Sequence, residues 1–176
     1  RFETDELPEV PLQIWIEDQP PITVLTGDEG FFEAEIELAQ PLDGDRLWHP
    51  IQIELLSEEE RVVFHFSQAE AIVVTDQAEF GVISDLDDTV VYTAATDVLK
   101  MITIAYLGNE RTRRPFEGVP EFYQALQQGR SGQAGNPIFY VSSSAWNMYD
   151  LFIKFLEFNE VPKGPIFLRD IELSLA

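Results

Sequence analysis

A short apolar strand that ends in paired carboxylates constrains the fold of this chain more than any other feature. Residues 80–83, Phe-Gly-Val-Ile, are typical of a central strand in a parallel sheet, which is buried on both faces. This run leads directly into DLDDT at residues 85–89. Ligands of open parallel sheets bind beyond the carboxyl ends of the strands. The sequence therefore predicts that Asp85 and Asp87 lie at a binding site.

Two aspartates at this spacing suit phosphoryl transfer. If the chain stays extended past the strand, residues two apart project to the same side, so Asp85 and Asp87 could face one substrate. One carboxylate could attack phosphorus while the other moves a proton, because aspartate is a known covalent nucleophile towards phosphate. The reaction otherwise requires positioning and positive charge, typically from Mg²⁺, which prefers one or two carboxylates. We interpret the pair as a catalytic site.

An acidic surface turn is the simpler alternative for this motif, and the residues alone leave it open. A calcium-binding loop is excluded. An EF-hand loop would need Asp or Asn at its fifth position, Gly at its sixth and Glu at its twelfth. Counted from Asp85, these positions hold Thr89, Val90 and Thr96.

A second apolar strand, predicted at residues 137–141, ends in three serines, 142–144, before a predicted helix over 146–158. Hydroxyls and free N–H groups at a helix N-terminus can bind an anion; capping of the helix by serine is the alternative. A third predicted strand, 166–168, ends in Arg169. This arginine could face the site or form a structural salt bridge.

Net charge is distributed unevenly. Residues 1–80 hold 20 acidic and three basic side chains, and so carry 17 of the 21 net negative charges. Such a field argues against nucleic acid as a partner and against docking on anionic lipid through this half, and solubility is the favoured explanation of the charge itself. The chain has no cysteine, no apolar stretch near the ~18 residues of a transmembrane helix and no secretory signal, so we expect a cytoplasmic protein.

The first part of the chain is predicted to be β. Apolar and acidic residues alternate strictly over 32–38, which would place Phe32, Ala34, Ile36 and Leu38 on a core face. A turn signal at 27–30 predicts a hairpin, and short strands at regular intervals indicate a small sandwich. The other predicted core positions are Leu12, Ile14, Ile16, Ile51, Ile53 and Leu55, and neither histidine, His49 or His65, has a catalytic or metal set beside it.

From residue 80 strands and helices alternate, which predicts an acidic β-sandwich-like domain at 1–79 and an α/β domain at 80–176. Helices are expected over 94–107 and from Gly118 through about Gln128. The basic cluster Arg111, Arg113 and Arg114 could recognise phosphate, or it could be solvated surface charge.

The segment FGVISDLDDTVVYT at 80–93 resembles the first motif of the haloacid dehalogenase superfamily. Within that superfamily the chain most resembles the actin-patch phosphatidate phosphatase family, a relative of the lipins. The likeness extends to PIFYVSSSAWNMYDLF at 137–152 and PKGPIFLRD at 162–170. It also extends upstream, where TVLTGDEGFFEAEIEL precedes the α/β domain much as a small β-domain does in that family.

This resemblance implies a haloacid dehalogenase-like Rossmannoid core and a magnesium-dependent phosphatase. The implied substrate is a phosphorylated small molecule or lipid, with phosphatidate converted to diacylglycerol through an aspartyl-phosphate. Asp85 would be the nucleophile and Asp87 the proton donor, with Mg²⁺ held by both. Thr89, Ser142 and Ser143 would contact the phosphate. Peripheral membrane contact and the oligomeric state stay open.

The family pattern continues, beyond the segment matched here, to a lysine and then to a Gly-Asp-Ser strand end that completes the magnesium site. The chain stops at Ala176, so the expectation is a core truncated before the third and fourth motifs. A catalytically incomplete phosphatase-like binding or scaffold protein is therefore the alternative. A serine hydrolase built on residues 142–144 is disfavoured, because there is no G-x-S-x-G turn and no histidine in that domain.

Overall fold

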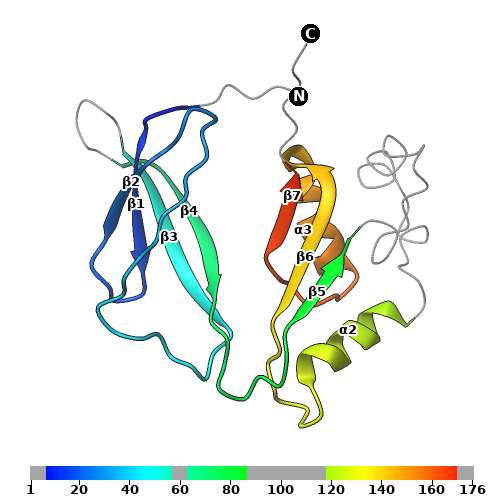
Figure 1. Ribbon diagram of the computed structural model, residues 1–176. Helices are drawn as coiled ribbons and strands as arrows, with labels where there is room; N and C mark the ends of the chain where they lie inside the picture. Colours follow the sequence, from blue (N-terminus) through cyan, green and yellow to red (C-terminus); the bar gives the residue numbers. More distant parts are fainter. Residues whose placement is uncertain (1–6, 57–62, 87–117, 170–176) are drawn as a thin grey trace. The chain divides into compact units, whose positions relative to one another are not determined.

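The computed structural model describes residues 7–56, 63–86 and 118–169 (Figure 1). The chain divides into two compact units, Arg1–Val73 and Val74–Ala176. The sequence-based boundary lies a few residues further along, after residue 79, and the two domain assignments stay predictions. None of the described helices is long and apolar enough to cross a membrane.

The first unit contains a four-stranded antiparallel sheet in the order β2-β1-β3-β4. Its strands are β1 (Pro11–Ile16), β2 (Ile22–Leu25), β3 (Trp48–Leu56) and β4 (Val63–Ile72). The alternating residues Leu12, Ile14 and Ile16 are buried, as predicted. They lie directly opposite Leu55, Ile53 and Ile51 in the β1–β3 register. Directly opposed residues share one face of a sheet, so the two predicted apolar stripes form one face.

The strand predicted over residues 32–38 is wrong, since this segment makes no ladder in the structure. Phe32 and Ala34 are exposed, and Ile36 and Leu38 are only half-buried. Alternation specifies a strand only where a neighbouring strand supplies hydrogen-bonding partners. The predicted turn does form, with the Gly30 N–H donating to the Gly27 carbonyl at 2.9 Å. The described strands before it, however, pair with each other, and a sandwich would require a second sheet, which is not found among the described residues of the first unit.

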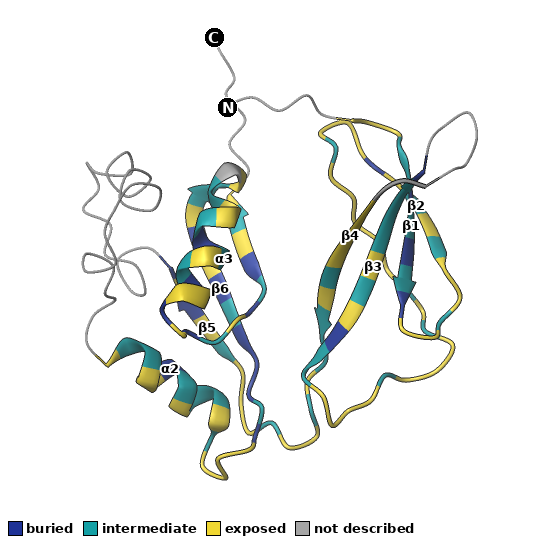
Figure 2. Ribbon diagram, turned by 180° about the vertical axis from the view of Figure 1, so that it is seen from behind, coloured by how far each residue is buried: buried dark blue, intermediate teal, exposed yellow. Residues whose placement is uncertain are grey.

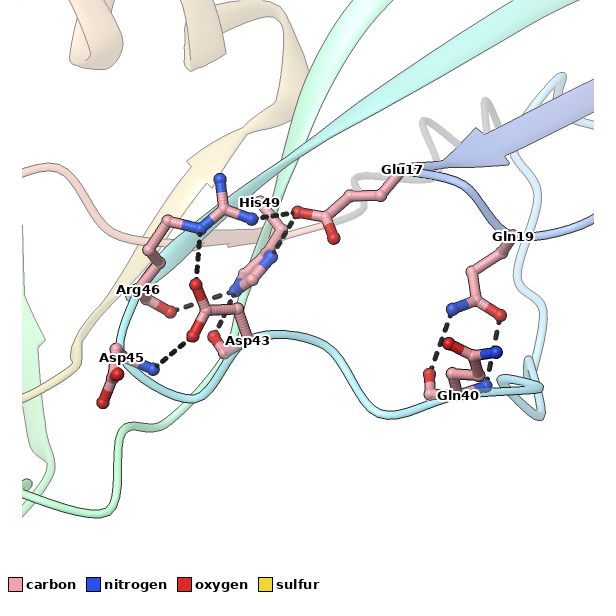
Figure 3. A network of polar contacts seen from close by, with 7 residues as sticks. All are labelled: Glu17, Gln19, Gln40, Asp43, Asp45, Arg46 and His49. Carbon is pink, nitrogen blue, oxygen red and sulfur yellow. Dashed lines mark hydrogen bonds and ion pairs between the residues drawn. The ribbon is translucent and has the colours of Figure 1, made fainter.

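A buried histidine links two loops of the first unit (Figure 3). His49 Nδ1 lies 2.7 Å from Glu17 Oε1, and Nε2 lies 3.0 Å from the carbonyl oxygens of Asp43 and of Arg46. The Arg46 guanidinium pairs with both Glu17 and Asp43. The hydrogen bond with His49 lowers the pKa of Glu17; partial burial opposes this effect and the charge of Arg46 adds to it. His49 therefore has a structural role.

The second unit contains a three-stranded parallel sheet in the order β5-β6-β7, so the α/β class is confirmed. The strands are β5 (Val82–Asp85), β6 (Ile138–Ala145) and β7 (Ile166–Arg169). The helices are α2 (Val119–Gln128) and α3 (Tyr149–Phe158), and the 3₁₀ turn η2 (Trp146–Met148) precedes α3. Both helices lie where the sequence predicts them. The helix predicted over 94–107 lies outside the described residues.

Glycine and proline fix the limits of α2. Gly118, before the helix, has φ 88°, and Gly129, after it, has φ 64°, in the left-handed region that side chains disfavour. Pro120 occupies the first turn, where its missing N–H costs no helical bond. These are the signals from which the sequence predicts the helix.

Both helices pack on the same face of the sheet. Alternation along β5 and β6 buries every second residue, a pattern visible along β6 in Figure 2. The opposite face carries Ile83, 76% exposed, and Phe167, 56% exposed. The core cluster on the helix-covered face consists of Leu86, Tyr123, Ile138, Tyr140, Phe152, Leu156, Val161 and Ile166.

The buried side chain of Asn136 joins three segments of this unit. Its Oδ1 accepts hydrogen bonds from the backbone N–H groups of Glu79, at 2.7 Å, and Phe80, at 3.2 Å. Its Nδ2 donates to the Leu126 carbonyl at 2.9 Å. Asn136 lies just before β6. Its side-chain amide therefore joins three places: the residues that lead into β5, the end of α2 and the start of β6.

Backbone packing also fixes the chain before β7. A Cβ added at Gly164 would lie 2.0 Å from the carbonyl oxygen of Ile138, closer than any side chain can approach. Only glycine lets this loop lie against β6, which positions the following strand.

We expect Asn136→Ala to destabilise the second unit by roughly 3 kcal/mol or more, because two N–H groups and a carbonyl would lose their buried partner at about 1–3 kcal/mol each. Urea unfolding followed by circular dichroism measures this loss. Asn159→Ala is the matched control, since Asn159 is also buried but its side chain makes one described hydrogen bond, to Phe155. Equal losses in the two variants would contradict the role given to Asn136.

We expect Glu17→Gln to flatten the acid dependence of the first unit's stability. A carboxylate with a lowered folded pKa contributes stability above its ordinary pKa, and this contribution is lost as the pH falls through the folded value. The wild-type chain should therefore lose stability more steeply than the variant from about pH 6 to about pH 3. Unfolding midpoints across this range test it, with the exposed Glu35→Gln as control. Parallel curves for Glu17→Gln and the wild type would refute it.

Candidate active site

The Asp85 carboxylate lies at the carboxyl end of β5. Asp85 is the last residue of the strand, is exposed, and pairs with Val141 of β6. The next residue, Leu86, is buried, and its N–H donates to the Val141 carbonyl at 2.9 Å. Because β5, β6 and β7 are parallel, their carboxyl ends lie along one edge. The structure thus places Asp85 at the sheet edge that the sequence predicts for a ligand.

The other residues predicted from this motif cannot be placed. Asp87 and Thr89 lie outside the described residues, as do Arg111, Arg113 and Arg114. Their roles stay predictions.

The three serines belong to strand β6, which corrects the prediction that the strand ends before them. The strand continues to Ala145, and Ala145 then pairs with Arg169 of β7. The following 3₁₀ turn has Ala145 at its N-cap and no side-chain cap hydrogen bond. None of the three serines therefore caps the 3₁₀ turn or α3 through its side chain. The ladder with β7 extends the strand, which local sequence could not show.

The serines also form an irregular section of the ladder. Val141 pairs with Phe167 and Ala145 pairs with Arg169, so four residue steps on β6 oppose two on β7. Such bulges bend the strand and re-aim side chains, and they are frequent beside active sites. Arg169 is two residues beyond Phe167, the partner of Val141, so its backbone lies roughly 7 Å further along the strand direction than Val141.

Alternation separates the serines by face. Ser142 is 8% exposed and Ser143 is exposed. Asp85 and its partner Val141 are exposed as well, which places Ser143 on the same face as Asp85. The Ser142 hydroxyl accepts a hydrogen bond from the Ser144 N–H at 2.9 Å. Phosphate contact by Ser142 and Ser143 stays a prediction.

The residue before Asp85 makes a contact that the sequence does not reveal. Ser84 is buried, and its Oγ lies 2.5 Å from the hydroxyl of Tyr123 in α2. Ser84 Oγ also donates to the Asp85 carbonyl at 3.1 Å. Tyr123 is 5% exposed, and its ring centroid lies 6.2 Å from that of Tyr140. Neither the burial of Tyr123 nor its partner is predicted from the sequence, because both depend on tertiary packing.

The described residues supply one predicted magnesium ligand. Within 7–56, 63–86 and 118–169, no group of three or more His, Asp or Glu side chains could hold a metal ion. Asp85, exposed at the end of β5, can offer one carboxylate. Mg²⁺ needs only one or two protein carboxylates, with water and substrate oxygens completing its shell, so this donor fits the ion.

Comparison with known proteins identifies the family of the second part of the chain. Residues 80–176 match the family described as phosphatidate phosphatase APP1, catalytic domain. No curated protein matches the chain significantly. The matched region begins just before β5 and includes Asp85, the three serines and Arg169, over more than half of the chain. The chain therefore belongs to the APP1 phosphatidate phosphatase catalytic-domain family.

Proposed function

We propose that this chain is a magnesium-dependent phosphatase that hydrolyses phosphatidate to diacylglycerol and phosphate. The observation that supports it best is the exposed Asp85 carboxylate at the carboxyl end of β5, inside the segment matched by the family. The parallel sheet with helices on one face is consistent with a haloacid dehalogenase-like core, which belongs to the same proposal. A cytoplasmic location with peripheral contact to lipid is part of it as well.

The proposed reaction has two displacements. First, an Asp85 carboxylate oxygen attacks phosphorus, the bond from phosphorus to the diacylglycerol oxygen breaks, and Asp87 gives its proton to that oxygen. Water then attacks the phosphorus of the aspartyl-phosphate while Asp87 takes a proton from it. The bond between phosphorus and the Asp85 oxygen breaks, which releases phosphate and restores the Asp85 carboxylate and the protonated Asp87. One water is consumed for each phosphatidate hydrolysed.

Charge neutralisation is the other requirement. Asp85 and Asp87 would hold Mg²⁺, which supplies positive charge for the phosphoryl oxygens. Ser143 shares the exposed face with Asp85, and the Ser143 hydroxyl could donate to a phosphoryl oxygen. Arg169, at the end of β7, could add a bidentate contact.

We expect Asp85→Asn to abolish magnesium-dependent phosphate release, with a loss of at least about a hundredfold, because an amide cannot form the acyl phosphate. The measurement is phosphate release from phosphatidate in detergent micelles with Mg²⁺. The control is Asp76→Asn, an exposed aspartate of the same unit that precedes β5. Activity that survives Asp85→Asn would refute the nucleophile assignment.

The scaffold alternative predicts a different result for the wild-type chain. A folded wild-type chain that neither binds Mg²⁺ in calorimetry nor releases phosphate would favour a phosphatase-like binding protein. Magnesium binding that is lost in Asp85→Asn would instead support the proposed ligand.

A further inference from the structure

We propose that Tyr123 and Ser84 form a hydrogen-bonded relay that positions the Asp85 nucleophile. The catalytic consequence of this relay rests on the proposed function, whereas the geometry of the relay does not depend on that function. Tyr123 comes from helix α2 and Ser84 from strand β5, and both are buried on the core face. Neither touches substrate in this proposal, so both are positioning residues.

The direction of each hydrogen bond follows from the acceptors. Ser84 Oγ donates its single proton to the Asp85 carbonyl, which can only accept. The contact of 2.5 Å between Ser84 Oγ and the Tyr123 hydroxyl must then be donated by Tyr123. The relay therefore runs from Tyr123 through Ser84 to the backbone of Asp85.

The Asp85 carbonyl points away from the β6 ladder. The Val82 N–H donates to the carbonyl of Pro137, the residue before β6, and the Leu86 N–H donates to the carbonyl of Val141 in β6, at 2.9 Å each. Peptide groups alternate in direction along a strand, so the N–H and C=O of Asp85 point away from β6. In the sheet of the described residues, β5 has a neighbouring strand on the β6 side only. Ser84 holds a carbonyl that the β6 ladder does not.

The donor end of the relay is fixed by packing. The Tyr123 ring belongs to the buried core cluster, beside Tyr140. The Tyr140 hydroxyl makes a different contact, since it donates to the Pro162 carbonyl at 2.7 Å. The two tyrosines thus share a core but hold different segments, which makes Tyr140→Phe a matched control for Tyr123→Phe.

Amide hydrogen exchange by NMR tests the relay in the 176-residue chain without substrate. In Tyr123→Phe we expect the Leu86 amide, next to Asp85, to exchange roughly 3- to 10-fold faster than in the wild type. The reason is that the variant loses one buried hydrogen bond, between Tyr123 and Ser84. The Val82 amide, at the start of β5, should keep its wild-type rate. Tyr140→Phe should leave the ratio of the two rates unchanged. An unchanged ratio in Tyr123→Phe overturns the relay.

Kinetics test the catalytic consequence. We expect Tyr123→Phe and Ser84→Ala each to lower kcat for phosphate release from phosphatidate roughly 3- to 10-fold, with KM within about twofold of the wild type. The double variant should lose no more than the worse single variant, because both act through one relay. A loss in Tyr123→Phe no larger than that in Tyr140→Phe overturns the positioning role.

The two proposals can fail separately. Wild-type activity equal to that of Asp85→Asn would refute the phosphatase, and the exchange rates would still decide whether Tyr123 positions Asp85. An active wild type with an unchanged exchange ratio would leave the phosphatase standing and remove the relay.

Discussion

One buried amide, that of Asn136, holds together the segments on which the second unit is built. Its oxygen receives the N–H groups of Glu79 and Phe80, and its nitrogen serves the carbonyl of Leu126. The chain can therefore enter β5 in one register only, because two consecutive N–H groups share one fixed acceptor. A buried amide satisfied on both sides is specific as well as stabilising, since an altered register would leave polar groups unpaired in the core.

The two faces of the parallel sheet carry different tasks. The helix-covered face packs apolar side chains, yet it includes two tyrosine hydroxyls with defined partners. Tyrosine suits this position because its ring contributes buried area and its tip remains a hydrogen-bonding group. Burial also raises the pKa of Tyr140, with a smaller effect from Tyr123, so its hydroxyl keeps the proton that it donates to Pro162. The exposed face carries the Asp85 carboxylate and is free of these packing requirements.

Local signals in the sequence predict much of the second unit. The glycines that bound α2 act over a few residues, and the structure agrees with the helix that they predict. The structure also agrees that an apolar strand leads into Asp85, but the predicted burial on both faces is wrong for the described residues, since β5 lies at an edge of their sheet and Ile83 is 76% exposed. The alternating segment 32–38 fails because a strand needs a partner, and the sequence does not say whether one is available. The predicted end of the second strand before the serines is wrong for the opposite reason, since β7 supplies a partner that extends β6 through them. The structural roles of Asn136 and Tyr123 cannot be predicted from local sequence, because their contacts join residues that are distant along the chain.

The mismatch between β6 and β7 has a consequence for how this fold could diversify. The register pairs Val141 with Phe167 and Ala145 with Arg169, so the three serines of β6 lie opposite the single residue Leu168 of β7. Replacements at Ser143, which is exposed, would change the chemistry beside Asp85 while the paired strands stay in place. Under the proposed function, related sequences could acquire new ligand preferences here without rebuilding the sheet, so that selection could act on recognition and on the framework independently.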